Sequence, residues 1–110
     1  MVSNAGTPTI SDPGFKLVRE CLIQGIKVEA IPGPSAILTA LVSSGLPTDK
    51  FLFLGYLPKK QGKRKKLLEN CKLSAVHYTL IFYESPHRLI ETLKDLQEIF
   101  GDIEIVLCRE

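Results

Sequence analysis

Short apolar segments that suit buried strands alternate along this 110-residue chain with segments whose apolar residues recur at helical spacing. "FLFLGYL" (51–57) and "YTLIFYE" (78–84) predict buried strands, because each is an almost continuous run of branched and aromatic residues. "KVEAI" (27–31) and "IEIVLC" (103–108) predict two more. Strands that alternate with helices are typical of the α/β class with a substantially parallel sheet.

Prolines and glycines punctuate the helical segments between these strands. Asp12 is the expected N-cap of the first helix, which Pro13 opens and Gly25 ends. The last helix is expected to begin at Pro86, capped by Ser85. The four predicted helices cover residues 13–24, 35–44, 62–73 and 86–100.

Three bends rich in small residues stand where a predicted helix is about to begin. They are "SNAGTPTISDPG" (3–14), "IPGPSA" (31–36) and "YESPHR" (83–88). Small side chains let a ligand approach the main chain, and the free N–H groups of a helix N-terminus favour acceptors. Ligands of open α/β sheets lie beyond the carboxyl ends of the strands, so the three bends could line one cleft. Taken singly, each could also be an ordinary capped turn.

One short cluster combines an acid, an imidazole and a guanidinium: Glu84, His87 and Arg88. These groups could carry acid–base chemistry, with Glu84 as the candidate catalytic base. The alternative is that Glu84 and Arg88 form an ion pair while His87 lies exposed in a first turn.

The segment "KKQGKRKK" concentrates positive charge. It holds six cations in eight positions, and removing these six from the net charge of +2 leaves −4 for the remainder. Such a run is either a solvated helix start or a phosphate-binding patch for nucleic acid. Six engaged single-strand phosphates would give a log–log salt slope of roughly −4. The candidate RNA-binding residues are Lys59, Lys60, Lys63, Arg64, Lys65 and Lys66.

Composition excludes several other classes of protein. No apolar run approaches 18 residues, so no membrane span and no membrane partner are expected. Three widely spaced cysteines on apolar faces are expected in the core, with neither a disulfide framework nor a metal site, which favours a cytoplasmic protein. No dinucleotide-type G-x-G-x-x-G and no Walker loop is present.

Four stretches in this order resemble the tetrapyrrole-methylase superfamily: "SNAGTPTISDPGF", "IPGPSA", "SGLPTDKFLFLGYLP" and "FYESPHRL". The last two together resemble its branch of ribosomal RNA small-subunit methyltransferases. The resemblance implies two α/β domains around a cleft that binds S-adenosylmethionine, methylation of a cytidine ribose 2′-hydroxyl in small-subunit ribosomal RNA, and a homodimer. The chain would then be a fragment, with residues 1–48 ending the N-terminal domain and residues 49–110 beginning the C-terminal domain.

The resemblance also implies roles for individual residues. Asn4 stands where the family usually has Asp, which puts in doubt a base or cation ligand at that position. His87 and Arg88 match the motif without an assigned role. The residues implied to contact the cofactor are Gly6, Thr7, Ile10, Ser35, Ala36, Tyr83 and Glu84.

Two other functions remain open from the sequence. One is a tetrapyrrole (corrin or porphyrin) methyltransferase, although a linear basic strip suits RNA better. The other is a catalytically inert RNA- or nucleotide-binding fragment. As a fragment, the chain is expected to bind S-adenosylmethionine weakly or not at all, and to self-associate through exposed strand edges and apolar faces.

Overall fold

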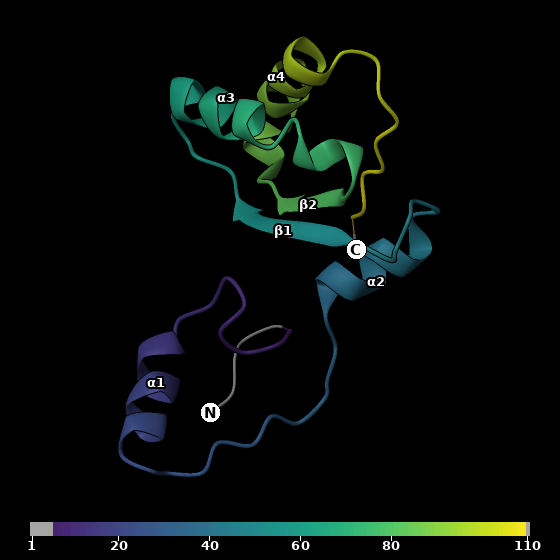
Figure 1. The fold of residues 1–110 in the computed structure, drawn as a ribbon. Coiled ribbons are helices and arrows are strands. Elements are labelled where there is room, and N and C mark those ends of the chain that lie inside the picture. The colour runs from purple at the N-terminus through teal and green to yellow at the C-terminus, as the bar shows by residue number, and fades with distance from the viewer. Residues whose placement is uncertain (1–5, 110) are drawn as a thin grey trace. The chain divides into compact units, whose positions relative to one another are not determined.

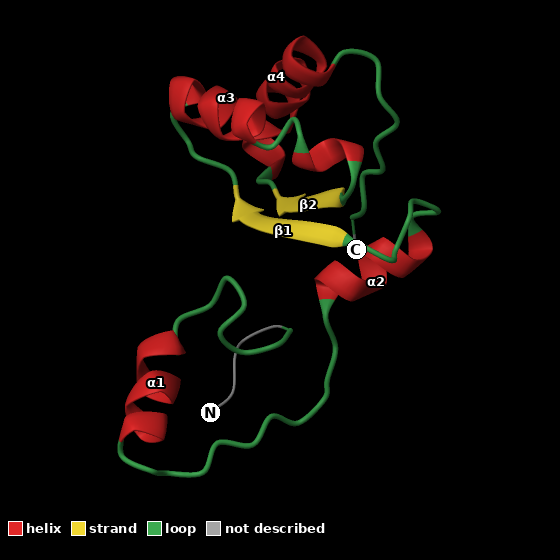
Figure 2. Cartoon of the chain, in the orientation of Figure 1, coloured by secondary structure: helices red, strands yellow, loops and turns green. Residues whose placement is uncertain are grey.

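The computed structural model describes residues 6–109, so Asn4 lies outside the described residues. The chain divides into two compact units, residues 1–39 and 40–110, and the division falls within helix α2 (Ala36–Ser43). The remaining elements are α1 (Phe15–Ile23), β1 (Phe51–Tyr56), α3 (Gln61–Asn70), η1 (Ser74–Val76), β2 (Thr79–Tyr83), η2 (Pro86–Arg88) and α4 (Leu89–Phe100) (Figures 1 and 2).

The first unit consists of loops around α1. Helix α1 begins after Gly14, whose φ of 138° favours glycine, so the predicted cap at Asp12 and first-turn role of Pro13 are wrong. None of the residues of α1 is buried. The predicted strand 27–31 is wrong: these residues form no strand, because a strand exists only through ladder hydrogen bonds to a neighbour.

The second unit is a βαβ arrangement, which confirms the α/β class and the parallel pairing predicted for 51–57 and 78–84. β1 and β2 pair in parallel, with Leu52 opposite Leu80 and Phe53 opposite Ile81. A parallel pair needs a long crossover, and α3 with η1 supplies it. Helices α3 and α4 lie on the same face of the strand pair (Figure 1).

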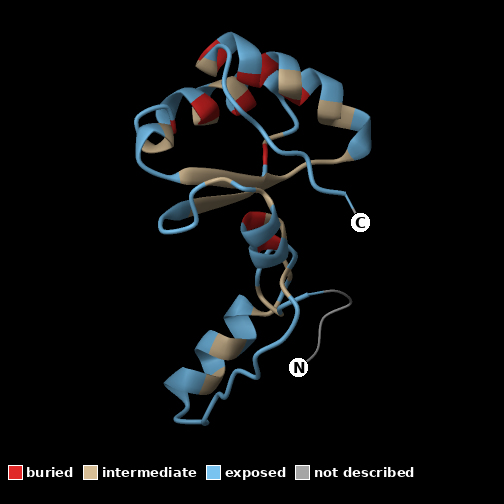
Figure 3. Ribbon diagram, turned by 90° about the vertical axis from the view of Figure 1, so that its right-hand side faces the viewer, coloured by how far each residue is buried: buried red, intermediate tan, exposed pale blue. Residues whose placement is uncertain are grey.

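The core of the second unit lies between those two helices and the sheet. Buried residues gather on α3 and α4 (Figure 3). Phe82 and Leu93 pack against this core from the sheet and from α4. Its buried members are Leu57, Leu68, Leu96 and Ile99.

Several predictions for this unit need correction. Residues 103–108 form no strand in the described chain, and Cys108 is exposed, whereas Cys71 is buried and Cys21 half-buried. The helix predicted from Pro86 begins as the 3-10 turn η2 and continues as α4. Helix α3 ends at Asn70, three residues earlier than predicted.

None of the helices in residues 6–109 is long and apolar enough to cross a membrane.

Candidate functional site

Two of the bends predicted to contact a ligand meet within the first unit. The Thr7 hydroxyl donates a hydrogen bond to the Pro34 carbonyl at 3.3 Å. A Cβ added at Gly6 would lie 3.9 Å from the same carbonyl oxygen, so a side chain there would occupy the space between the bends. The structure therefore brings Gly6 and Thr7 beside the turn that leads into Ser35.

The bend after Gly6 has an unusual backbone. Thr9 and Ser11 have φ of 71° and 53°, and a β-branched residue such as Thr9 rarely adopts this region. Strain of this kind costs about 1–3 kcal/mol and clusters at ligand sites. The special backbone at Gly6 and Gly14 was predictable from glycine itself, whereas the residue types of Thr9 and Ser11 give no sign of positive φ.

The other residues of this unit that were predicted to contact the cofactor are either exposed or cap a helix. Ile10 is exposed, as is Ala36. The half-buried Ser35 caps α2, since its hydroxyl accepts a hydrogen bond from the Leu38 N–H at 3.4 Å. Small, accessible residues and an irregular main chain fit a ligand that is held by backbone groups.

In the second unit, Glu84 is the centre of a hydrogen-bond network at the carboxyl end of β2. Its carboxylate lies 2.6 Å from the Arg88 guanidinium, accepts the Thr92 hydroxyl at 2.6 Å and accepts the Ser85 N–H at 2.7 Å. Only 7% of the Glu84 side chain is exposed. Arg88 also donates to the Leu57 carbonyl at 3.1 Å, which ties the chain just after β1 to the end of β2.

These contacts match the ion-pair alternative weighed from the sequence. A carboxylate that already accepts three donors has little free capacity to accept a substrate proton. The catalytic role of Glu84 remains a prediction, and its contacts support an anchoring role. His87 lies exposed in η2.

Tyr83 ends β2 beside two other aromatic rings. Its ring centroid lies 5.1 Å from that of Phe53 and 5.3 Å from that of Tyr56. Tyr83 was a predicted site residue and Tyr56 was not. The structure shows that Tyr56 is 61% exposed.

The basic segment separates into buried, paired and exposed cations. Arg64 is fully buried, and its Nε donates to the Asp95 carboxylate at 2.7 Å. Lys65 pairs with Glu98 at 2.6 Å. The other four cations are exposed and have no ion pair within the described residues: Lys59, Lys60, Lys63 and Lys66.

Arg64 therefore does not lie on the surface that was predicted to bind RNA. Its Nη1 donates to the carbonyls of Pro58 and Lys59 at 3.5 and 3.4 Å. Its Nη2 lies 3.6 Å from the Glu91 carboxylate, beyond hydrogen-bond distance. Arg64 thus fixes the chain that carries the exposed lysines, which we call the lysine surface: Lys59, Lys60, Lys63 and Lys66.

Two ionisable groups at the contact between α3 and α4, Asp95 and Lys65, have shifted pKa values. Burial by itself raises the pKa of Asp95, but hydrogen bonds from Gln61 and Arg64 and the nearby positive charges outweigh it, so the pKa lies below its ordinary value. The hydrogen bond to Glu98 holds the pKa of Lys65 above its ordinary value.

Helix α3 has no acidic residue in its first turn, so the lysine surface adds to the positive end of the helix dipole.

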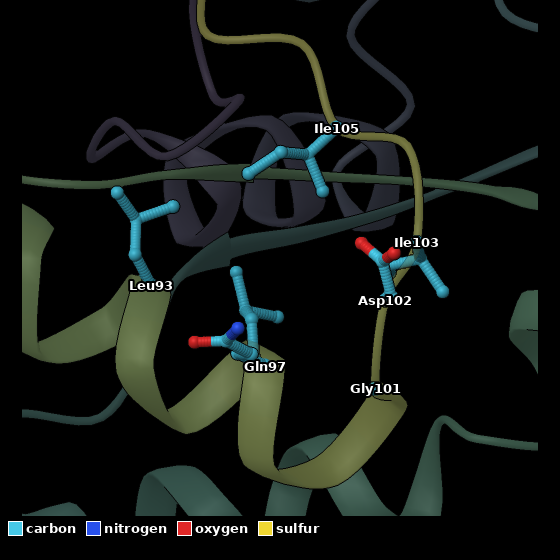
Figure 4. Close-up of a pocket in the computed structure, with 7 residues that line it drawn as sticks. Leu93, Gln97, Gly101, Asp102, Ile103 and Ile105 are labelled. Carbon is cyan, nitrogen blue, oxygen red and sulfur yellow. The ribbon is translucent and has the colours of Figure 1, made fainter.

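A shallow hollow elsewhere in the second unit does not involve any predicted site residue. Figure 4 shows Leu93 and Gln97 of α4 lining it with Ile103 and Ile105 of the extended segment that follows. No cluster of possible metal ligands occurs among residues 6–109.

The chain belongs to the family of Tetrapyrrole (Corrin/Porphyrin) Methylases, which it matches over residues 1–110. Within that family it is similar to curated proteins named ribosomal RNA small subunit methyltransferase I. The relative from Vibrio cholerae is 54% identical over 112 residues, which cover all of this chain and 38% of the relative. Those from Halalkalibacterium halodurans and Thermotoga maritima are 50% and 47% identical over all of this chain, and the aligned regions cover 37% and 48% of their lengths. The chain thus spans less than half the length of these relatives.

Proposed function

We propose that this chain is part of an S-adenosylmethionine-dependent methyltransferase that modifies small-subunit ribosomal RNA, at the ribose 2′-hydroxyl of a cytidine. The observation that supports this most strongly is the identity of about half of its residues, over its whole length, to relatives named for that RNA. The four lysines of the lysine surface, which face solvent and have no ion pair among residues 6–109, support an RNA substrate.

The proposed cofactor contacts fit what the structure shows of the first unit. Gly6, Thr7 and Ile10 would hold S-adenosylmethionine on one bend, and Ser35 and Ala36 on the other, mainly through main-chain groups. The hydrogen bond from Thr7 to Pro34 supports a joint role for the two bends. In the second unit, Tyr83 and Glu84 would border the adenosine.

The cofactor supplies an activated methyl group on a sulfonium, so the protein has mainly to position the acceptor hydroxyl. The network around Glu84 would contribute rigidity at the end of β2. A base that assists the ribose hydroxyl remains a prediction for Glu84, and a pH profile of the transfer rate tests it.

The partners and the setting belong to the same proposal. An RNA substrate and the three free cysteines support a cytoplasmic protein. A homodimer is part of the family expectation, and analytical ultracentrifugation would measure it.

A graft into a relative tests the proposal. In the V. cholerae relative, the segment that aligns with this chain is replaced by these 110 residues, and transfer of labelled methyl from S-adenosylmethionine to small-subunit ribosomal RNA is measured. We expect the graft to retain transfer and the Gly6→Val graft to lose it, because a branched side chain would occupy the space beside Pro34. Lys72→Ala, at an exposed lysine outside the lysine surface, is the matched control.

A folded graft without transfer to RNA would contradict the proposal. Transfer to a porphyrin or corrin in place of RNA would establish the tetrapyrrole alternative. Binding of RNA by the 110-residue chain, combined with an inactive graft, would support the inert binding fragment.

A further inference from the structure

Tyr56 is exposed because of an irregularity in β1. Simple alternation along the strand would place Tyr56 on the same face as Leu52 and Leu54. The register instead shifts between Phe53 and Tyr56, and Gly55 has φ of 64°. This bulge brings Tyr56 opposite Tyr83 and leaves it 61% exposed. Bulges that redirect a side chain in this way are frequent next to active sites.

The ring of Tyr56 packs against Tyr83, which in turn packs against Phe53. Tyr56 and Tyr83 are tilted by 50° at 5.3 Å, and Tyr83 meets Phe53 edge to face at 74° and 5.1 Å. Because Phe82 packs against the core under the helices, its neighbour Tyr83 points to the opposite face of the strand pair. The three rings therefore form an aromatic platform on the face away from α3 and α4.

The chain leads from this platform directly into the lysine surface. Leu57 is only 2% exposed, and its carbonyl accepts the hydrogen bond from Arg88. The next two carbonyls, of Pro58 and Lys59, accept hydrogen bonds from the buried Arg64. Lys59 lies three positions after Tyr56, which limits the distance between their Cα atoms to about 11 Å. The main chain between Tyr56 and Lys60 is thus anchored at three consecutive carbonyls.

We propose that Tyr56 stacks on an unpaired base of RNA while Lys59 and Lys60 contact phosphates of the same strand. Single-stranded RNA is the partner whose chemistry matches an exposed ring beside lysines that lack an ion pair within the described part of the chain. The cofactor fits this pair of features less well, because S-adenosylmethionine carries no phosphate. This inference rests on the proposed RNA substrate and adds to it the site where a base is held.

The test measures binding of the 110-residue chain to a fluorescent single-stranded oligocytidine RNA and to the same oligonucleotide with abasic positions. We expect Tyr56→Ala to weaken binding of the base-containing RNA about 5- to 100-fold. Tyr56→Phe keeps the ring and should stay within about twofold of the unsubstituted chain. The slope of log affinity against log salt should not change, because the lysines keep their phosphates. The abasic RNA should not distinguish the variants.

Tyr78→Ala is the matched control. Tyr78 is 44% exposed and precedes the first residue of β2, so it lies at the opposite end of the parallel pair. Urea unfolding of each variant verifies that it is folded.

Each other outcome has a distinct meaning. Equal affinities for Tyr56→Ala and Tyr78→Ala, with salt-dependent binding intact, would overturn the stacking site and leave the RNA substrate standing. An effect of Tyr56→Ala on S-adenosylmethionine binding alone would also overturn the stacking site. If the chain shows no salt-dependent affinity for RNA, the stacking site and the proposed RNA contact of the lysine surface both fail, while the graft still tests methyl transfer.

Discussion

The two units of the chain differ in what holds them in shape. In the first, α1 has no buried residue, and Phe15, Leu22 and Ile23 are at least 60% exposed. In the second, four buried aliphatic residues form a core, and a fully buried Arg64–Asp95 pair joins α3 to α4. The difference teaches that the second unit is held by its own core and by a buried ion pair, whereas the described residues of α1 have no packing of this kind.

The largest effect is expected from removing the buried carboxylate. Asp95→Asn leaves the charge of Arg64 buried without its partner, which should lower the free energy of unfolding by about 3–5 kcal/mol. Urea unfolding followed by circular dichroism measures it. Glu91→Gln is the control, because Glu91 is exposed and lies 3.6 Å from Arg64. The apolar pair Arg64→Met/Asp95→Leu should recover much of the loss, and equal losses in all three variants would contradict the buried-pair account.

A single core substitution sharpens the contrast between the units. Leu68→Ala should cost about 2–5 kcal/mol, because Leu68 is fully buried. Leu22→Ala, at a 60% exposed position of α1, should cost less than about 0.5 kcal/mol. Native-state hydrogen exchange measures both. Comparable costs at the two positions would show that α1 is buried in solution.

The network at the end of β2 should have an intermediate effect. Glu84→Gln weakens the charged contacts to Arg88 and Ser85 and should cost about 1–3 kcal/mol. Thr92→Val removes one donor to the same carboxylate and should cost less, and thermal unfolding compares the two. In the active graft, an anchoring Glu84 predicts a stability loss with an unchanged pH profile. Loss of an acidic limb from that profile, without loss of stability, would indicate a catalytic base.

Acid should destabilise the second unit through Asp95. The folded-state pKa of Asp95 is lowered, so its contribution to stability is complete above the ordinary pKa of about 3.8 and is lost as the pH falls through the folded value. Stability measured from pH 6 down to pH 2 should therefore fall more steeply for the unsubstituted chain than for Asp95→Asn. Parallel curves would contradict the lowered pKa.

The smallest effect is expected in the first unit. Thr9→Gly removes the strain of a β-branched residue at φ 71° but adds backbone freedom to the unfolded chain. A stability gain below about 1 kcal/mol is expected, measured by thermal unfolding. Ile10→Gly, at a neighbouring position without positive φ, should give no gain. A loss for both variants would mean that the bend is not strained.

Sequence patterns predicted the paired strands and the helices of the second unit. The paired strands 51–57 and 78–84 and the helix ending at Phe100 follow from long apolar runs and helical spacing. The strands predicted at 27–31 and 103–108 are wrong, because a strand needs a neighbour and sequence pattern does not supply one.

The sequence motifs of the candidate site could be predicted, but the positions of its side chains could not. The bulge at Gly55, which exposes Tyr56, cannot be derived from alternation. The burial of Arg64 did have a signal, because Arg64 lies four and seven residues before the buried Leu68 and Cys71, on one helical face. Charge counting alone placed it with the exposed lysines.

The salt dependence of RNA binding tests most directly whether the lysine surface of the second unit binds RNA phosphates. Four exposed lysines, with Arg64 buried and Lys65 paired, predict a log–log slope of roughly −3 for single-stranded RNA. Replacing all four by glutamine should make the affinity almost independent of salt. An unsubstituted chain whose RNA affinity does not change with salt would contradict the account.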